Sequence, residues 1–284
     1  MEGLTISVLN YQGKEVLQPC LDSILAQEIP KPYDIQIIDN ASTDGSAEEA
    51  FSKYQEVKYL IHADNKYQFI TGLNESFKQA RYEDVLFLSN DLILEKGSLS
   101  TLVDTYRRLD KVIVQPVFKT LEGKIQNAGM DMLWPGYGVS NKILGEFGPF
   151  FETEVFATTA FIMSKSAFKE IGLFDERFAP AFMEDVDYSI RATGLGYRLL
   201  VDKTSSMRHY TSHSFSKRYS HRQIEGFYHQ NRIKLIEKHH RGLQRIIRRT
   251  AMNFLDLAMY SARYISEKSL QVVAKWRSPK NEGK

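Results

Sequence analysis

Residues 4–40 have the sequence LTISVLNYQGKEVLQPCLDSILAQEIPKPYDIQIIDN. Two apolar runs, LTISVLN (4–10) and DIQIIDN (34–40), are rich in β-branched residues and have the length of strands. Between them, EVLQPCLDSILAQ (15–27) places apolar residues at helical spacing. A strand, a helix and a second strand in this order are typical of a parallel sheet that is covered by helices. The segment therefore predicts an α/β domain.

The same alternation continues to residue 91. We predict further strands at 57–62 and 84–91, and helices at 47–54 and 72–81. All four strands end in polar residues, namely Asn10, Asp39 with Asn40, His62, and Asn90 with Asp91. Any one of them is explained by the loop that follows a strand. Ligands of open α/β sheets bind outside the carboxyl ends of the strands, so four such ends together indicate a ligand site. No GxGxxG or GxxxxGK[ST] motif is present, so the usual dinucleotide and phosphate loops are not indicated.

Composition limits the class of protein. The chain has 284 residues, of which 43% are hydrophobic and 25% charged, which fits one large globular domain with an appendage. A single cysteine, Cys20, excludes an internal disulfide framework and a cysteine-based zinc site. The N-terminus lacks the pattern of a signal peptide, and no window approaches the ~20 apolar residues of a membrane span. We therefore expect a cytoplasmic protein.

Charge divides the chain into two parts. Residues 217–284 carry 16 Lys and Arg against 5 Asp and Glu, whereas residues 1–216 carry 21 against 30. The basic part is predicted to be helical almost throughout, with an apolar stripe at helical spacing. Such a helix can pack on the first domain, mediate a homo-oligomer through 241–277, or lie on an anionic membrane surface. We rank packing and oligomerisation ahead of membrane contact, and we expect no nucleic-acid binding because the body is acidic.

The segment FAPAFMEDVDYSIRATGLGYRLL (178–200) places Glu184, Asp185 and Asp187 beside an apolar run. These carboxylates could form a helix N-terminus, a metal site or a catalytic base. Carboxylates in a first helical turn gain about 0.3–1 kcal/mol from the helix dipole. That gain explains acidic residues in general but does not explain an adjacent pair.

Together these segments resemble the inverting family-two nucleotide-sugar glycosyltransferases, in particular rhamnosyltransferase-like members. The resemblance covers about residues 4–215, and it rests on ISVLNYQGKEVLQPCLDSILAQ, IQIIDNASTDGS, VLFLSNDLIL, the run from ATTAF to GYRLL (157–200), and SSMRHYTSHS. It implies a GT-A fold over 1–215, which is a Rossmann-like, mostly parallel sheet flanked by helices, with a helical C-terminal extension over 216–284.

The resemblance also implies an activity. A single sugar would pass from a UDP- or dTDP-sugar donor to a hydroxyl of a glycan or lipid-linked acceptor, as in bacterial surface polysaccharide synthesis. Such an enzyme is expected in the cytoplasm, with a peripheral position on the inner face of the cell membrane as an option.

The donor site follows residue by residue from the matched motifs. Asp39 can accept the imide N–H of uracil or thymine, and Tyr11 can stack on the base. The residues assigned to donor binding are Asn10, Tyr11, Asp39, Asn40, Ser42, Asp44, Gly72, Asn74 and Asn90. An alternative for this segment is a turn that caps the next helix, with Ser46 or Asp44 as N-cap and Glu48 or Glu49 in the first turn. Gly72 and Asn74 belong to NKYQFITGLN (65–74), which departs from the family's Gly-rich pattern.

The metal and the base are assigned to different segments. Asp91 matches the last carboxylate of the family's D-x-D-like motif, although Ser89 replaces the first, and His209 matches a histidine that can complete a Mg²⁺ or Mn²⁺ site. His213 is a less favoured substitute. Asp185 matches the general base and Glu184 its neighbour, whereas Asp187 and Arg191 are expected to be structural.

Two questions stay open at this level. Residues 127–141 are predicted to form a Gly- and aromatic-rich loop. Its Trp134 and Tyr137, with Phe147, could form an acceptor platform or pack into the core, since rings stack on apolar sugar faces as well as on each other. A catalytically silent sugar-nucleotide-binding or scaffold protein is one rival, motivated by Ser89 and the altered 65–74 segment. A sugar nucleotidyltransferase is a weaker rival, because LNYQGKE is a poor triphosphate loop.

Overall fold

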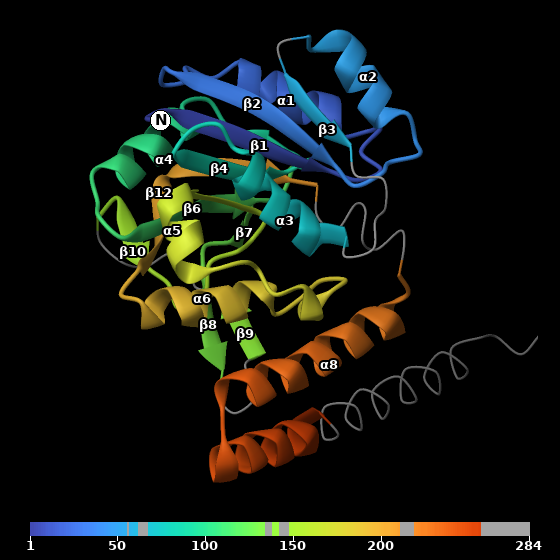
Figure 1. The fold of residues 1–284 in the computed structure, drawn as a ribbon, viewed down its shortest axis with the longest axis vertical. Helices are drawn as coiled ribbons and strands as arrows, with labels where there is room; N and C mark the ends of the chain where they lie inside the picture. Colours follow the sequence, from blue (N-terminus) through green and yellow to red (C-terminus); the bar gives the residue numbers. More distant parts are fainter. Residues whose placement is uncertain (56, 62–67, 134–137, 142–147, 211–218, 257–284) are drawn as a thin grey trace, which may run out of the picture.

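The computed structural model describes residues 1–55, 57–61, 68–133, 138–141, 148–210 and 219–256. One large mixed sheet forms its centre (Figure 1). The strands are β1 (Leu4–Asn10), β2 (Tyr33–Asp39), β3 (Lys58–Ile61), β4 (Asp84–Ser89), β5 (Leu92–Leu94), β6 (Val112–Lys119), β7 (Ile125–Asn127), β8 (Met130–Leu133), β9 (Gly138–Asn141), β10 (Phe150–Glu152), β11 (Ala160–Ser164) and β12 (Arg198–His209).

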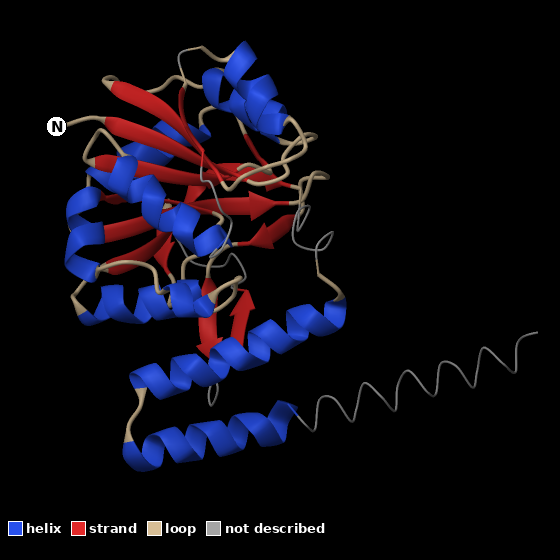
Figure 2. Ribbon diagram, turned by 45° about the vertical axis from the view of Figure 1, so that its right-hand side comes forward, coloured by secondary structure: helices blue, strands red, loops and turns tan. Residues whose placement is uncertain are grey.

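The order across the sheet is β10-β12-β6-β11-β4-β1-β2-β3, with β5 on β12 and β7 on β6. β4, β1, β2 and β3 run parallel, and β11 enters antiparallel between β4 and β6. Every residue of β1 is buried, as expected of a strand that is covered on both faces. Helices lie on both faces of the sheet (Figures 1 and 2), so the predicted α/β architecture is confirmed.

The described helices include the three predicted within residues 15–81, whose ends are shifted. They are α1 (Leu17–Leu25), α2 (Ser46–Lys53), α3 (Gln68–Gln79), α4 (Ser98–Arg107), α5 (Lys165–Ile171), α6 (Glu184–Gly194), α8 (His221–His239) and a last helix at 242–256. The prediction began α3 at Gly72, four residues late. Gly72 lies inside the helix, where α3 packs closely on β1. A glycine is needed at this position because a Cβ would come within 2.2 Å of Leu9 Cδ1.

Two short segments differ from the prediction. The strand predicted at 84–91 ends at Ser89, and Asn90 and Asp91 form a turn before β5. This turn places both side chains at the end of the sheet. The loop predicted at 127–141 contains β8 and β9, which pair antiparallel outside the main sheet.

Within residues 219–256, the C-terminal part forms two helices where the sequence predicts helix almost throughout. His240 has an extended backbone (φ −128°, ψ 148°), and Gly242 has a φ of 54° that favours glycine. The helix at 242–256 turns back along α8 (Figures 1 and 2), where Arg249 pairs with Glu237 at 2.9 Å. Leu235 and Ile236 of α8 are fully buried in the main hydrophobic core. The later turns of α8 are therefore packed on the α/β domain.

Candidate active site

The carboxyl ends of β1, β2 and β4 are joined by a buried polar network. Asn10 Nδ2 donates to Asp39 Oδ1 at 2.6 Å, and Asn90 Nδ2 donates to Asn10 Oδ1 at 2.6 Å. The parallel register of β1 and β2 pairs Asn10 with Asp39 directly. Asp39 also accepts hydrogen bonds from the amide and the hydroxyl of Ser42. Asn10 and Asp39 are buried, so their polar atoms mainly satisfy each other.

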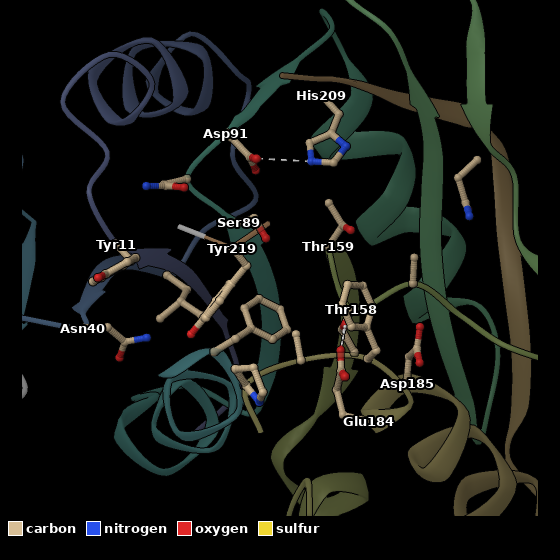
Figure 3. Close-up of a pocket in the computed structure, with 18 of the residues that line it drawn as sticks. Tyr11, Asn40, Ser89, Asp91, Thr158, Thr159, Glu184, Asp185, His209 and Tyr219 are labelled. Atoms are coloured by element: carbon tan, nitrogen blue, oxygen red, sulfur yellow. Dashed lines mark hydrogen bonds and ion pairs between the residues drawn. The ribbon is translucent and has the colours of Figure 1, made fainter. Parts of the chain in front are cut away.

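A cavity of about 420 Å³ lies next to this network, at the carboxyl ends of the strands. Seven of the residues assigned from the sequence line it: Tyr11, Asn40, Asn90, Asp91, Glu184, Asp185 and His209. Figure 3 shows Tyr11 and Asn40 on one wall, Asp91 with His209 at one end, and Glu184 with Asp185 at the other. Residues from distant segments are thus brought to one site.

Other assigned residues lie beneath or away from this cavity. Asn10, Asp39, Ser42 and Asp44 do not line it. Asp44 instead accepts hydrogen bonds from the Lys14 amide and from Ser46, beside the start of α2. The predicted turn before α2 is therefore present, with Glu48 and Glu49 in the first turn of the helix, but the predicted N-cap is wrong: Gly45 holds that position without a side-chain cap, and Asp44 and Ser46 flank it.

Gly72 and Asn74 also lie outside the cavity lining. Asn74 is fully buried, and its amide group exchanges two hydrogen bonds with the backbone of Phe174, at 3.0 and 2.8 Å. In this structure it ties α3 to the chain that leads to α6. Trp134, Tyr137, Phe147 and His213 lie outside the described residues.

Asp91 and His209 have the geometry of adjacent ligands to one ion. Asp91 Oδ2 lies 3.3 Å from His209 Nε2, and two neighbouring ligand atoms each about 2.1 Å from a Mg²⁺ lie about 3 Å apart in an octahedron. Asp91 Oδ1 is buried and has no hydrogen-bond partner among the residues that the structure describes. Hard oxygen and imidazole ligands of this kind fit Mg²⁺ or Mn²⁺.

Gln126 orients the imidazole of His209. Its Oε1 lies 3.1 Å from His209 Nδ1, and because a carbonyl oxygen only accepts, this contact places the proton on Nδ1. His209 Nε2 then keeps its lone pair beside Asp91. Within the described ranges, no group of three or more His, Cys, Asp or Glu side chains could hold a metal ion. Asp91 and His209 are therefore the two candidate metal ligands that can be described.

Glu184 and Asp185 occupy the first turn of α6 in different environments. Glu184 is buried, and its Oε1 accepts a hydrogen bond from Thr158 Oγ1 at 3.0 Å. Burial raises the pKa of Glu184, and the adjacent Asp185 charge raises it further. Asp185 lies at the pocket wall, where its Oδ1 accepts the Val186 amide at 2.8 Å, and desolvation raises its pKa above the ordinary carboxyl range. The arrangement favours the proton on Glu184 and the anion on Asp185.

Asp187 is confirmed as structural. It is fully buried and pairs with Arg191 Nε at 3.0 Å, Lys238 Nζ at 2.7 Å and His239 Nε2 at 2.8 Å. The contacts with Lys238 and His239 join α6 to α8, and Asp187 does not line the cavity.

Sequence reasoning missed several cavity residues. They are Phe69, Asn127, Thr158, Thr159, Phe182 and Tyr219. Thr158 and Thr159 stand in the matched ATTAF segment but have no charge to attract attention. Phe182 directly precedes the Met183–Glu184–Asp185 run, and its φ of 77° could not be anticipated from a phenylalanine.

Comparisons with known proteins agree with this arrangement. The family model described as "Glycosyl transferase family 2" matches residues 5–172, more than half of the chain. Poly-beta-1,6-N-acetyl-D-glucosamine synthase of Staphylococcus epidermidis is 27% identical over 62% of this chain and 42% of its own length. The matched region thus spans less than half of that protein. N-acetylglucosaminyl-diphospho-decaprenol L-rhamnosyltransferase of Mycobacterium tuberculosis is 24% identical over 74% of this chain and 77% of its own length.

Solved structures share the fold. GalNAc-T7 with UDP, GalNAc and Mn²⁺ superposes with a TM-score of 0.64 at 16% identity, covering 72% of this chain and 42% of that one. Staphylococcus aureus TarS 1–349 in complex with UDP gives 0.56 at 19% identity, covering 83% of this chain and 65% of that one. Both are GT-A glycosyltransferases, which confirms the predicted GT-A fold. None of the described helices is long and apolar enough to cross a membrane.

Proposed function

Because this chain belongs to glycosyl transferase family 2, we propose that it transfers a single sugar, with inversion, from a UDP- or dTDP-linked donor to a hydroxyl of a glycan or lipid-linked acceptor. One observation carries the proposal: Asp91 with His209 and Glu184 with Asp185 lie at opposite ends of one cavity (Figure 3). A diphosphate at the first end presents its sugar toward the second, where a carboxylate is available.

Asp185 is the base in this proposal. It removes the proton from the acceptor hydroxyl while that oxygen forms a bond to the anomeric carbon. The bond from this carbon to the diphosphate oxygen breaks on the opposite face, and its electron pair leaves with the nucleoside diphosphate. Glu184 stays protonated, so it adds no second negative charge beside the attacking oxygen.

Asp91 and His209 would hold a Mg²⁺ or Mn²⁺ ion. When bound, the ion supplies Lewis-acid stabilisation of the charge on the departing diphosphate. Gln126 keeps the His209 lone pair available, and the unpartnered Asp91 Oδ1 offers a further ligand atom. The presence of Mn²⁺ with UDP in GalNAc-T7 supports this assignment.

The nucleoside is assigned to the wall formed by Tyr11 and Asn40. Tyr11 can stack on the base, and Asn40 can hydrogen-bond to the base or the ribose. Beneath them, the network of Asn10, Asp39 and Ser42 fixes the two strand ends. UDP in the TarS complex supports a uridine donor, and the name of the mycobacterial relative supports a diphosphate-linked lipid acceptor and a deoxyhexose.

The acceptor class fits a position at a membrane surface. Leu243, Ile246, Ile247 and Phe254 are exposed on one face of the helix at 242–256, with Phe254 71% exposed. Arg245, Arg248 and Arg249 lie on the rest of its circumference, which gives the composition of a helix that lies in a bilayer interface. We therefore assign this face to an anionic membrane.

Calorimetry with UDP and dTDP, with and without Mn²⁺, tests the donor site, and a panel of nucleotide sugars tests transfer or slow hydrolysis. We expect Mn²⁺-enhanced nucleotide binding that Asp91→Asn weakens at least about tenfold, since one charge-assisted ligand is lost. The anomeric configuration of the product, read by NMR, tests inversion. No nucleotide binding under any condition would overturn the enzyme assignment.

A further inference from the structure

Helix α8 contacts the backbone that leads into Glu184 and Asp185. Asn231 of α8 is 1% exposed. Its side-chain nitrogen lies 2.6 Å from the carbonyl oxygen of Phe178, 2.9 Å from that of Ala181 and 3.1 Å from that of Phe182. Two N–H groups thus serve three carbonyls in one buried position. None of the matched sequence motifs includes this residue.

The backbone held by Asn231 has an unfavourable conformation. Phe182 and Met183 have φ angles of 77° and 73°, in the left-handed region that bulky residues rarely adopt. Such conformations persist only where the surrounding structure determines them, and they gather at functional sites. Met183 is the N-cap of α6 without any side-chain cap, so this strained turn sets where the helix begins.

The same segment forms part of the cavity. Pro180, Ala181 and Phe182 line it, and Glu184 and Asp185 follow after one residue. A shift of this segment therefore moves the cavity wall and the candidate base together.

Further contacts from α8 fix the orientation of Asn231 and support the segment at both ends. Lys234 Nζ lies 2.9 Å from Asn231 Oδ1 and 2.6 Å from the Arg177 carbonyl oxygen. Lys234 can only donate, so the Asn231 amide nitrogen must face the three carbonyls. Tyr228 meets the ring of Phe182 edge-on, with 6.0 Å between centroids.

We propose that Asn231 is a positioning residue of the transfer reaction, which holds segment 178–183 so that the Asp185 carboxylate is aimed into the cavity. The inference rests on the proposed function, because it assigns to α8 a part in orienting the base. It makes the C-terminal helix a component of the active site. A displacement of about 1 Å in a reacting group is enough to cost about 10²-fold in rate.

The test compares Asn231→Asp with Gln230→Glu in the full chain. Both variants replace an amide with a carboxylate on α8, but Gln230 is exposed and faces no carbonyl of the segment. Asn231→Asp loses its donor and sets an anion against three carbonyl oxygens. We expect kcat per UDP-binding site to fall at least about tenfold while the KM for the donor changes less than about twofold. Gln230→Glu should match the wild type.

Hydrogen–deuterium exchange gives a readout that does not need activity. Peptides covering 178–190 should exchange faster in Asn231→Asp, whereas peptides covering 33–55 should not change. If Asn231→Asp does not fold, Lys234→Met removes the neighbouring donor to the Arg177 carbonyl from a half-exposed position and should lower kcat in the same direction. A wild type without donor binding would refute the proposed function. A functional wild type with unchanged kcat and exchange in these variants would refute the role of Asn231.

Discussion

Two adjacent carboxylates, Glu184 and Asp185, differ because their surroundings differ. Glu184 is 5% exposed, and its Oε2 has no hydrogen-bond partner among the described residues. Asp185 accepts a backbone amide at the positive end of α6 and opens into the cavity. Burial of the first favours its protonated form, so a single negative charge remains at the position where a hydroxyl must lose a proton.

Asp185→Asn should nearly abolish sugar transfer while nucleotide binding is kept. The amide cannot accept the hydroxyl proton, and general-base help contributes about 10²–10⁴ in rate. The measurement is kcat with a saturating donor, alongside the Kd for UDP by calorimetry. The control is Asp110→Asn at an exposed position in the turn after α4, which should leave both values unchanged. Near-normal transfer by folded Asp185→Asn would show that another group is the base.

The pH dependence of transfer should carry the signature of a buried base. Desolvation raises the pKa of Asp185 from 3.8 to about 6, and the base is active only when deprotonated. Activity is therefore expected to be lost as the pH falls through about 6, rather than near 4 as for an exposed carboxylate. The measurement is kcat/KM between pH 4.5 and 8 with a constant concentration of Mn²⁺. A profile that stays flat down to pH 4.5 would contradict this environment for Asp185.

At the level of residues, the sequence identified the segments that form the site, but it did not distinguish the residues that line the cavity from those buried beneath it. Asn40 and Asp91 were predicted from strand ends and Tyr11 from the family resemblance, and all three line the cavity. Asn10 and Asp39 end strands in the same way but are buried beneath the cavity and do not line it. Their burial follows from the pairing of β1 with β2, which sets their side chains against each other. No local pattern distinguishes a polar residue that faces a ligand from one that faces a neighbouring strand.

Among the elements, α6 is held from two sides. Its first turn follows the strained turn at Phe182 and Met183, and this first helical turn carries Asp187, which pairs with Lys238 and His239 of α8. Burial alone would raise the pKa of Asp187, but the hydrogen bond from His239 and the charges of Arg191 and Lys238 lower it. The cluster therefore favours a fully ionised Asp187 inside the protein.

Asp187→Asn should destabilise the fold by about 3 kcal/mol, because it leaves cations without their buried counter-charge. The measurement is the free energy of unfolding in urea at pH 7. The matched control is Glu237→Gln, which breaks the exposed pair with Arg249 between α8 and the last helix and should cost less than about 1 kcal/mol. Equal losses of unfolding free energy in the two variants would show that the buried ion pairs of Asp187 stabilise the fold no more than an exposed pair does.

The same variant should change how stability depends on pH. Asp187 has a lowered pKa in the folded state, so its contribution is complete above the unfolded pKa near 4 and is lost as the pH falls through the folded pKa. Wild-type stability should fall below pH 5 more steeply than that of Asp187→Asn. Parallel curves would contradict the lowered pKa.

At this scale the sequence predicted the alternation of strands and helices but not their ends. Gly72 looked like a helix boundary, and close packing on Leu9 makes it an interior residue. Gly242 indicated the break between the two C-terminal helices, but the apolar residues on both sides of it continue at helical spacing, so the break was not predicted. Tertiary contacts decide such cases, and these contacts join residues distant in the chain.

In the whole molecule, the helix at 242–256 packs one face on the protein and exposes an apolar face. Met252 is buried toward the core, and Asp256 pairs with Arg232 and His229 of α8. The opposite face is apolar and exposed, with Leu243 70% and Ile246 60% exposed. A lone exposed leucine needs no explanation, but several on one face of one helix mark an interaction surface. The basic surplus of residues 217–284 favours an anionic bilayer as that surface.

The double substitution Ile246→Glu and Phe254→Glu should reduce binding to anionic vesicles at least about tenfold, because it places two charges on the face that enters the interface. The measurement is cosedimentation with vesicles of phosphatidylglycerol and phosphatidylcholine, in low and high salt, since attraction of basic side chains to anionic lipid weakens as salt screens it. The control is Phe51→Glu on α2, where a phenylalanine is 65% exposed on another element. Transfer to a soluble acceptor should stay at the wild-type level, because neither substituted residue lines the cavity. Vesicle binding that survives the double substitution would contradict the assignment of this face to the membrane. A wild-type dimer that the substitution dissociates would assign the face to a second copy of the chain instead.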